Sequence, residues 1–229
     1  MFRPRQPRKR QPAFPFLFVS GFDPVDLGLV ASLNRPGGNA TGVSLFSAEL
    51  VPKRLELLYG LGSRIRKVGV LLNPASGTPD IEAKQALAVA RLKGYQLALF
   101  EASTASGIEE AFILAAEQKI SAFLVTGSPF FSRQRAQIVM LAAQHRIPVM
   151  YLWREYVDDG GLMSYGTELT WGYRLIGEYA GRILKGQRPG DLPVQQPTKF
   201  DFVINLKTAK ELGLTVPRTL FAFATEIIE

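Results

Sequence analysis

Apolar runs of strand length alternate with helical stretches through the middle of the chain, and this alternation restricts the fold more than any other feature. The runs cover residues 67–72, 96–100, 122–125 and 149–152, and the helical stretches between them cover residues 78–93, 107–118 and 133–145. Buried strands that alternate with helices of this length are typical of a parallel sheet covered on both faces. We therefore expect a four-stranded α/β unit over residues 66–153, with right-handed crossovers.

The flanking sequence predicts parts of another, incomplete lobe. The flanking elements are strands at 14–19, 40–46, 162–165 and 200–205 and helices at 25–33, 48–61, 170–185 and 206–212. Asp23 followed by Pro24 is a signal for the start of the helix at 25–33. The incomplete lobe has only two expected strands, fewer than the roughly four that an independent parallel sheet usually has.

These elements suggest four segments. They are a basic, proline-rich disordered tail at 1–13, an incomplete first lobe with crossovers at 14–47 and 166–199, a complete second α/β lobe at 48–165, and a carboxy-terminal strand and helix at 200–229 that pack back near the hinge.

The positive charge of the chain belongs to the tail. The 229 residues include 27 Lys plus Arg and 20 Asp plus Glu, a net charge of +7, but five of the basic residues lie within residues 1–10. The remainder carries 22 basic and 20 acidic residues, or +2. A nucleic-acid-binding protein would carry its positive charge across a folded face, so we expect no nucleic-acid partner. The tail itself is either a disordered start or an electrostatic arm.

Export cannot be read from this composition. The absence of cysteine does not determine the compartment. The apolar run at 14–19 has six residues and contains Pro15, whereas a secretory signal needs about 7–15 apolar residues. As written, the chain has no export signal, which predicts a cytoplasmic protein if Met1 is the true start.

Candidate ligand-binding residues follow the expected strands. Ligands of open parallel sheets bind beyond the carboxyl ends of the strands. Hydroxyl, amide and helix amino-terminal groups there suit a ligand carboxylate, and aromatic rings there could stack on a planar solute. The candidates are Ser20, Gly21, Asp23, Asn73, Ser76, Ser128, Tyr151, Trp153 and Tyr165.

Each candidate also has a purely structural interpretation. Asp23 could cap a helix, and Asn73 before Pro74 is a common turn pair. Tyr151 and Trp153 could simply pack in a hinge. These alternatives stay open at the level of sequence.

Catalytic and metal-binding constellations are absent from the sequence. His145 is the single histidine and there is no cysteine to complete a metal site. Glu109 and Glu110 are adjacent on an expected helix and cannot face one another. We therefore expect neither an enzyme nor a bound cofactor.

Several motifs, in one order, carry a family resemblance. They are SGFDPVDLGLVASLNRPGGNATGVSL at 20–45, ELVPKRLELL at 49–58, VGVLLNP at 68–74, GLMSYG at 161–166, YAGRILKGQRPGDLPVQQPTKFDFVINLKTAKELGL at 179–214, and the closing segments 216–217 and 226–229. The chain resembles the ABC-transporter substrate-binding proteins whose characterised relatives bind aromatic amino acids such as tryptophan and phenylalanine.

The resemblance implies a type I periplasmic-binding-protein fold, here with one complete Rossmann-like lobe and an incomplete second lobe. It implies a small organic solute held between two lobes without catalysis, an ABC permease as partner and a periplasmic location. Family members carry a signal peptide and further strand–helix units before the segment at Phe14, so the chain resembles an amino-terminally truncated member.

Two alternatives follow from the same fold. One is an effector-binding domain of the lactose-repressor type, for which the tail is too short to form a helix-turn-helix. The other is a truncated fragment that binds no solute and forms a homodimer through the incomplete lobe, because the strand at 14–19 would leave an exposed sheet edge.

Overall fold

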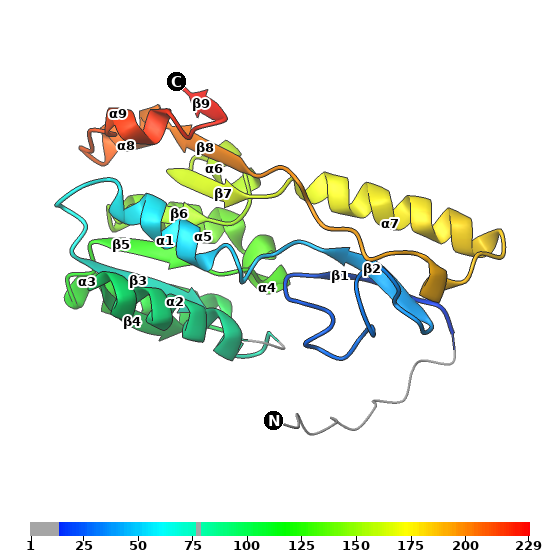
Figure 1. The fold of residues 1–229 in the computed structure, drawn as a ribbon. Coiled ribbons are helices and arrows are strands. Elements are labelled where there is room, and N and C mark those ends of the chain that lie inside the picture. The colour runs from blue at the N-terminus through cyan, green and yellow to red at the C-terminus, as the bar shows by residue number, and fades with distance from the viewer. Residues whose placement is uncertain (1–13, 77–78) are drawn as a thin grey trace. The chain divides into compact units, whose positions relative to one another are not determined.

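A computed structural model describes residues 14–76 and 79–229, which divide into two compact units. The first unit is the chain up to Phe46 with Leu169–Thr198, and the second unit is Ser47–Glu168 with Lys199–Glu229 (Figure 1). The predicted tail at 1–13 and the predicted helix start at Thr78 lie outside the described residues. Each unit is built around its own sheet.

The second unit contains a mostly parallel sheet, in agreement with the predicted α/β class (Figure 1). Its strand order is β4-β3-β5-β6-β7-β8-β9, and only the β7–β8 pair is antiparallel. The strands are β3 (Lys67–Leu72), β4 (Gln96–Glu101), β5 (Ala122–Val125), β6 (Val149–Tyr151), β7 (Met163–Gly166), β8 (Asp201–Asn205) and β9 (Glu226–Ile228).

Helices pack against both faces of this sheet. They are α1 (Val51–Tyr59), α2 (Pro79–Lys93), α3 (Ala105–Glu117), α4 (Pro129–Arg133), α5 (Arg135–Gln144), α6 (Glu155–Asp158), α8 (Leu206–Glu211) and α9 (Arg218–Phe221). Successive side chains of β5 point to opposite faces of the sheet and are buried on both. Leu124 belongs to a core cluster with Leu55 of α1, whereas the ring of Phe123 lies 5.1 Å from that of Phe112 of α3. This double burial explains why the strands read as continuous apolar runs.

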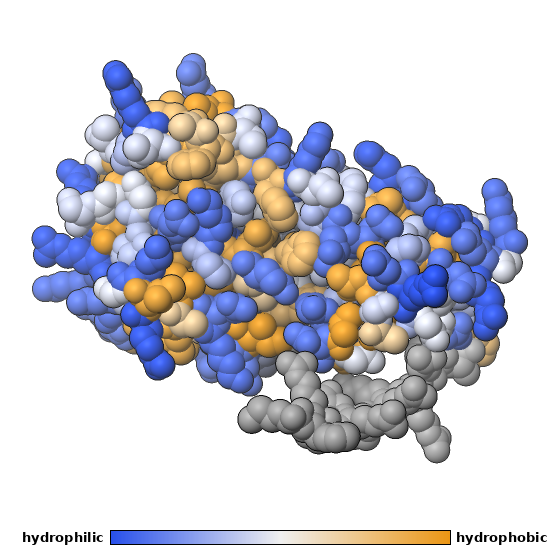
Figure 2. Space-filling view, viewed as in Figure 1, coloured by the Kyte–Doolittle hydropathy of each residue, from blue (hydrophilic) through white to orange (hydrophobic). Residues whose placement is uncertain are grey.

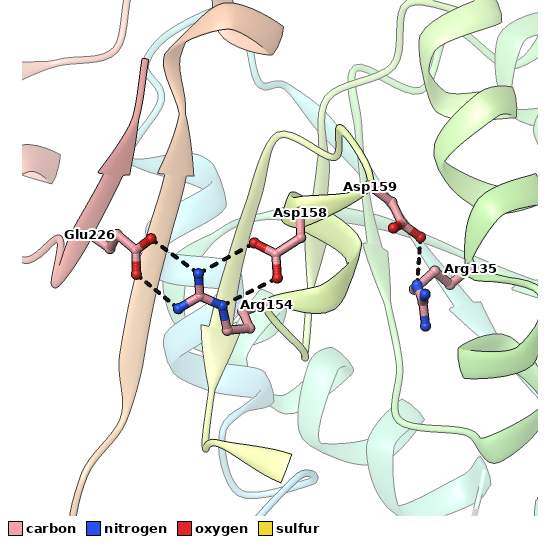
Figure 3. Close-up of polar contacts among 5 residues, drawn as sticks. All are labelled: Arg135, Arg154, Asp158, Asp159 and Glu226. Carbon is pink, nitrogen blue, oxygen red and sulfur yellow. Dashed lines mark hydrogen bonds and ion pairs between the residues drawn. The ribbon is translucent and has the colours of Figure 1, made fainter. Parts of the chain in front are cut away.

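Residues 199–229 extend the sheet of the second unit. β8 pairs with β7, and β9 pairs with β8. Arg154 fixes this end of the chain, because its guanidinium donates to both carboxylate oxygens of Glu226, at 2.8 and 3.1 Å, and also to Asp158 (Figure 3). These hydrogen bonds raise the pKa of Arg154 above its ordinary value. Neither β9 nor α9 is evident from the sequence pattern.

The first unit pairs two short strands under one long helix. β1 (Phe16–Ser20) and β2 (Ala40–Ser44) are parallel, and α7 (Leu169–Leu184) packs on them; η1 (Pro189–Asp191) lies beside β2. The following segment continues along β2, where the Thr41 hydroxyl donates to Leu192 O at 2.6 Å and Val43 forms a bridge with Gln195. The core of this unit is a small cluster of Phe18, Val30, Ala40 and Val194.

The predicted helix at 25–33 is wrong, because the segment forms turns. Its expected start is present, since the Asp23 carboxylate accepts the Val25 N–H at 2.7 Å. Gly28 then adopts a φ of +69°, which is outside helical backbone conformation and ends the turn. The capping signal was read correctly, but the segment is too short to propagate a helix past this glycine.

Charged and apolar residues are mixed on the face of the molecule drawn in Figure 2. Phe223, after α9, is 59% exposed, and the Lys53 ammonium lies 4.9 Å from its ring centroid.

Within the described ranges, no helix combines the length and apolar character needed to cross a membrane.

Candidate functional site

Two predicted site residues meet where β3 and β5 end. These strands are parallel neighbours, with Leu71 paired to Val125, so the segments after them emerge at the same edge of the sheet. There the Asn73 side-chain amide donates to the Ser128 hydroxyl oxygen at 2.9 Å. Both side chains are buried. The sequence placed both residues at strand ends, and the structure brings them into contact.

Within the protein, the hydroxyl oxygen of Ser128 acts as a hydrogen-bond acceptor. Its oxygen accepts a second hydrogen bond from the Phe130 N–H at 3.2 Å, which caps α4. With two N–H groups directed at the oxygen, the hydroxyl proton stays available to an acceptor on a ligand. The Asn73 carbonyl oxygen accepts the Ala75 N–H, and the predicted Ser76 hydroxyl donates to Asn73 O at 2.7 Å.

Thr167 is a further candidate at this edge that the sequence analysis missed. It follows β7, which runs parallel to β6 in the same sheet, so it emerges at the same edge as Asn73 and Ser128. Thr167 is 5% exposed, and within residues 14–76 and 79–229 its hydroxyl has no hydrogen-bond partner. A buried hydroxyl without a partner is costly, which points to a bound group that completes it. We refer to Asn73, Ser76, Ser128 and Thr167 as the carboxyl-edge site.

Glu82 supports the loop of this site from inside the protein. It lies in the first turns of α2, is 1% exposed, and accepts the Gly127 N–H at 3.0 Å. Burial raises the pKa of Glu82 above its ordinary value of 4.5, while Arg54 and the Gly127 N–H act in the opposite direction. Glu82 therefore fixes the backbone immediately before Ser128.

Arg54 supplies the opposite charge. It is completely buried on α1 and donates to Val125 O at 3.4 Å and to Ser47 O. Burial lowers its pKa to about 10, and the negative charge of Glu82 partly offsets this effect. A buried arginine and glutamate thus lie behind the site without facing solvent. The position of Arg54 is a weak sequence signal of its burial, because Arg54 precedes Leu58 by one helical turn and so lies on the apolar side of the helix.

Tyr151 and Trp153 lie inside the second unit. Tyr151 has no exposed surface, and its ring stacks on Tyr156 with centroids 4.6 Å apart. Trp153 is 8% exposed. Tyr165 is half-buried on β7 and lies 6.1 Å from the ring of Phe200. The rings of Tyr151 and Tyr165 therefore pack against other rings of the second unit.

Ser20, Gly21 and Asp23 belong to the first unit, where their polar groups serve local turns. Ser20 Oγ donates to Phe22 O and accepts the Phe22 N–H, and Asp23 caps the turn described above. Gly21 lies between them at the end of β1, half-buried.

Across the described part of the chain, no group of three or more His, Cys, Asp or Glu side chains is placed to hold a metal ion.

The fold agrees with the class of protein that comparison identifies. The sequence model of the family described as "ABC transporter substrate binding protein" matches residues 9–228. The chain belongs to this family. The family, and the relatives described below whose names state a function, are substrate-binding proteins rather than enzymes.

One curated relative aligns with most of the chain. The chain is 29% identical over 201 residues to a tyrosine-binding protein of Clostridioides difficile (strain R20291), with 87% of this chain and 57% of that protein aligned. The chain thus spans a little over half the length of this curated relative.

Two solved structures are similar in fold to this protein. One is the ABC domain in complex with L-Trp from Streptococcus pneumonia, with a TM-score of 0.82, 25% identity, and coverage of 93% of this chain and 73% of that chain. The other is a conserved domain protein from Vibrio cholerae O1 biovar El Tor strain N16961, with a TM-score of 0.80, 28% identity, and coverage of 90% and 68%. The predicted periplasmic-binding-protein fold is therefore confirmed.

Proposed function

We propose that this protein binds a small organic solute of the aromatic amino-acid type at the carboxyl-edge site and passes it to an ABC-type permease outside the cytoplasmic membrane. The observation that carries the proposal is the hydrogen bond from Asn73 to Ser128, which joins two strand-end loops and leaves the Ser128 hydroxyl proton free for a ligand. The tyrosine-binding and tryptophan-bound relatives support the solute class.

The chemistry of the site suits a carboxylate. Ser128 and Thr167 each carry a buried hydroxyl, and neither hydroxyl proton is needed to hold the fold. Hydrogen bonds to an ionised acceptor are about twice as strong as neutral ones, so two such donors favour the carboxylate of an amino acid over a neutral solute. Glu82 keeps the loop backbone in place for this contact.

Thermal unfolding of the chain with L-tryptophan, L-tyrosine and L-phenylalanine tests this proposal. A ligand at about 100 times its dissociation constant adds roughly 2.7 kcal/mol to the free energy of unfolding, which raises the melting temperature. Ser128→Ala should reduce this shift, whereas the control Ser63→Ala, at an exposed position, should not. Absence of a shift with all three amino acids, or an equal shift in Ser128→Ala, would count against the proposal.

A further inference from the structure

A cavity lies at the opposite edge of the second unit's sheet from the carboxyl-edge site. It opens between the end of α5, the first residues of β6 and β7, and α8, and has a volume of about 110 Å³. Polar groups form part of its wall, and apolar side chains form the rest, those of Val139, Ile147, Val149, Leu162 and Leu212. Ile147 and Val149 precede and begin β6, and Leu162 precedes β7, so the cavity lies at the amino-terminal ends of these two parallel strands.

Tyr151 contributes a polar group to this cavity. Its side chain lines the cavity, is completely buried, and within the described part of the chain its hydroxyl has no hydrogen-bond partner. The ring is fixed by stacking on Tyr156 and by close approach to Gly161, where an added Cβ would lie 2.5 Å from it. Burial raises the pKa of Tyr151, so the phenol stays neutral and keeps its proton. A neutral donor in a fixed position is thus available.

Polar side chains at the rim of the cavity donate hydrogen bonds to backbone carbonyl groups. The Arg146 guanidinium donates to Glu211 O at 3.1 Å, and the Thr208 hydroxyl donates to Gly160 O at 2.8 Å. Arg146 and Glu211 are exposed and carry opposite charges, so the rim attracts neither sign strongly. These bonds hold α8 over the turn that precedes β7. The rim therefore favours a neutral ligand.

We propose that this cavity is a second ligand site, which takes a neutral molecule of about one ring in size whose oxygen accepts a hydrogen bond from Tyr151. An apolar cavity of about 150 Å³ holds benzene, so the space here suits a single ring or a short alkyl chain. The site is separate from the solute site proposed above and does not depend on it.

Phenol and toluene are the probes, because they share a ring and differ in the hydroxyl oxygen. Titration of the isotope-labelled intact chain, followed by amide chemical shifts, should show phenol perturbing residues of α5, β6 and α8. Phenol should bind more tightly than toluene by up to roughly tenfold, the usual worth of one hydrogen bond. Tyr151→Phe should remove this preference while leaving toluene binding unchanged.

A variant that blocks the cavity provides the second measurement. Ala143 is exposed and lines the rim at the end of α5, so Ala143→Trp should abolish binding of both probes without disturbing the core. Ala88→Trp, at an exposed position of α2, is the matched control and should bind both normally. Equal affinity for phenol and toluene in the unmodified chain, unchanged binding in Ala143→Trp, or displacement of phenol by saturating L-tryptophan would each overturn the proposal. If L-tryptophan does not bind but phenol does, only the proposed solute function fails.

Discussion

Arg54 and Glu82 are buried groups of opposite charge behind the loop that carries Ser128, and each favours the charged form of the other. Glu82→Gln keeps an acceptor for the Gly127 N–H but leaves the Arg54 charge without its counter-charge. Removing one partner of a buried pair costs about 3–5 kcal/mol, whereas replacing both is often close to neutral. We therefore expect Glu82→Gln to lower the free energy of unfolding by that amount, and Arg54→Met with Glu82→Gln to recover most of it.

Urea unfolding followed by circular dichroism measures both variants, with Arg54→Met alone completing the double-mutant cycle. If the losses of the two single variants simply add in the double variant, the two charges do not stabilise each other and the interpretation is wrong.

Thr167 and Ser128 both carry buried hydroxyls; within residues 14–76 and 79–229 the Ser128 oxygen caps α4, and the Thr167 hydroxyl has no hydrogen-bond partner. Thr167→Val removes a polar atom without a partner, so the stability of the free protein should be unchanged or rise by up to about 1 kcal/mol. If the hydroxyl binds solute, affinity should fall by roughly tenfold in the same variant. Chemical unfolding and isothermal titration with L-tryptophan measure the two effects. A stability loss without an affinity loss would assign Thr167 a structural role.

The candidate site could be predicted from the sequence only in part. Asn73 and Ser128 follow apolar runs, and the rule that ligands bind beyond strand ends leads directly to them. Glu82 and Arg54 lie on helices, where charged residues usually face solvent. The place of Arg54 on the apolar side of α1 is a weak signal in the sequence, and burial in the structure reveals the role of both residues. Thr167 follows a short strand whose pairing partners are distant in the chain, so its lack of a partner appears only in three dimensions.

At the scale of elements, the long helices and most strands were predictable, and the short elements α4, α6, α9 and β9 were not. The predicted helix at 78–93 corresponds to α2, and the predicted strand at 67–72 matches β3. The helix expected at 133–145 corresponds to α5, and the backbone of Gln134 (φ −93°, ψ 15°) separates it from α4, which the sequence pattern does not predict. The missed elements have three to five residues and no apolar run of their own, so tertiary contacts such as that of Arg154 with Glu226 in β9 fix them.

The pairing of β1 with β2 depends on a glycine. A Cβ at Gly42 would lie 2.0 Å from the backbone oxygen of Phe18, the residue paired with it. Gly42→Ala must therefore push the strands apart, and we expect a loss of at least about 1–3 kcal/mol in unfolding free energy. Gly181→Ala is the control in α7 of the same unit. No atom would lie within 4 Å of its new Cβ, and alanine favours a helix by up to about 1 kcal/mol.

Urea titration of both glycine variants, followed by circular dichroism, separates these outcomes. Equal stability of Gly42→Ala and the unmodified chain would show that the strands tolerate a side chain at this position.

At the scale of the whole molecule, the two units differ in how much apolar side chain they bury. In the described part of the first unit, the core cluster consists of Phe18, Val30, Ala40 and Val194. The second unit has a far larger cluster, which joins strands β3, β5, β6, β7 and β8 with α1 and α8. Because burial of apolar surface is the main stabilising term in folding, the two units should differ in local stability.

Hydrogen exchange of the intact chain, followed by mass spectrometry of peptides, measures this difference directly. Peptides covering β1 and β2 should exchange through an opening of lower free energy than peptides covering β3 and β5, after correction for intrinsic rates. The reason is that opening the first unit exposes the small apolar cluster around Phe18, whereas opening the second unit exposes the much larger apolar cluster between its strands and helices. Gly42→Ala should increase exchange in β1 and β2 and leave β3 and β5 unchanged. If all four strands exchange at one rate in the unmodified chain, the two units open together and the small core of the first unit is stabilised by the second.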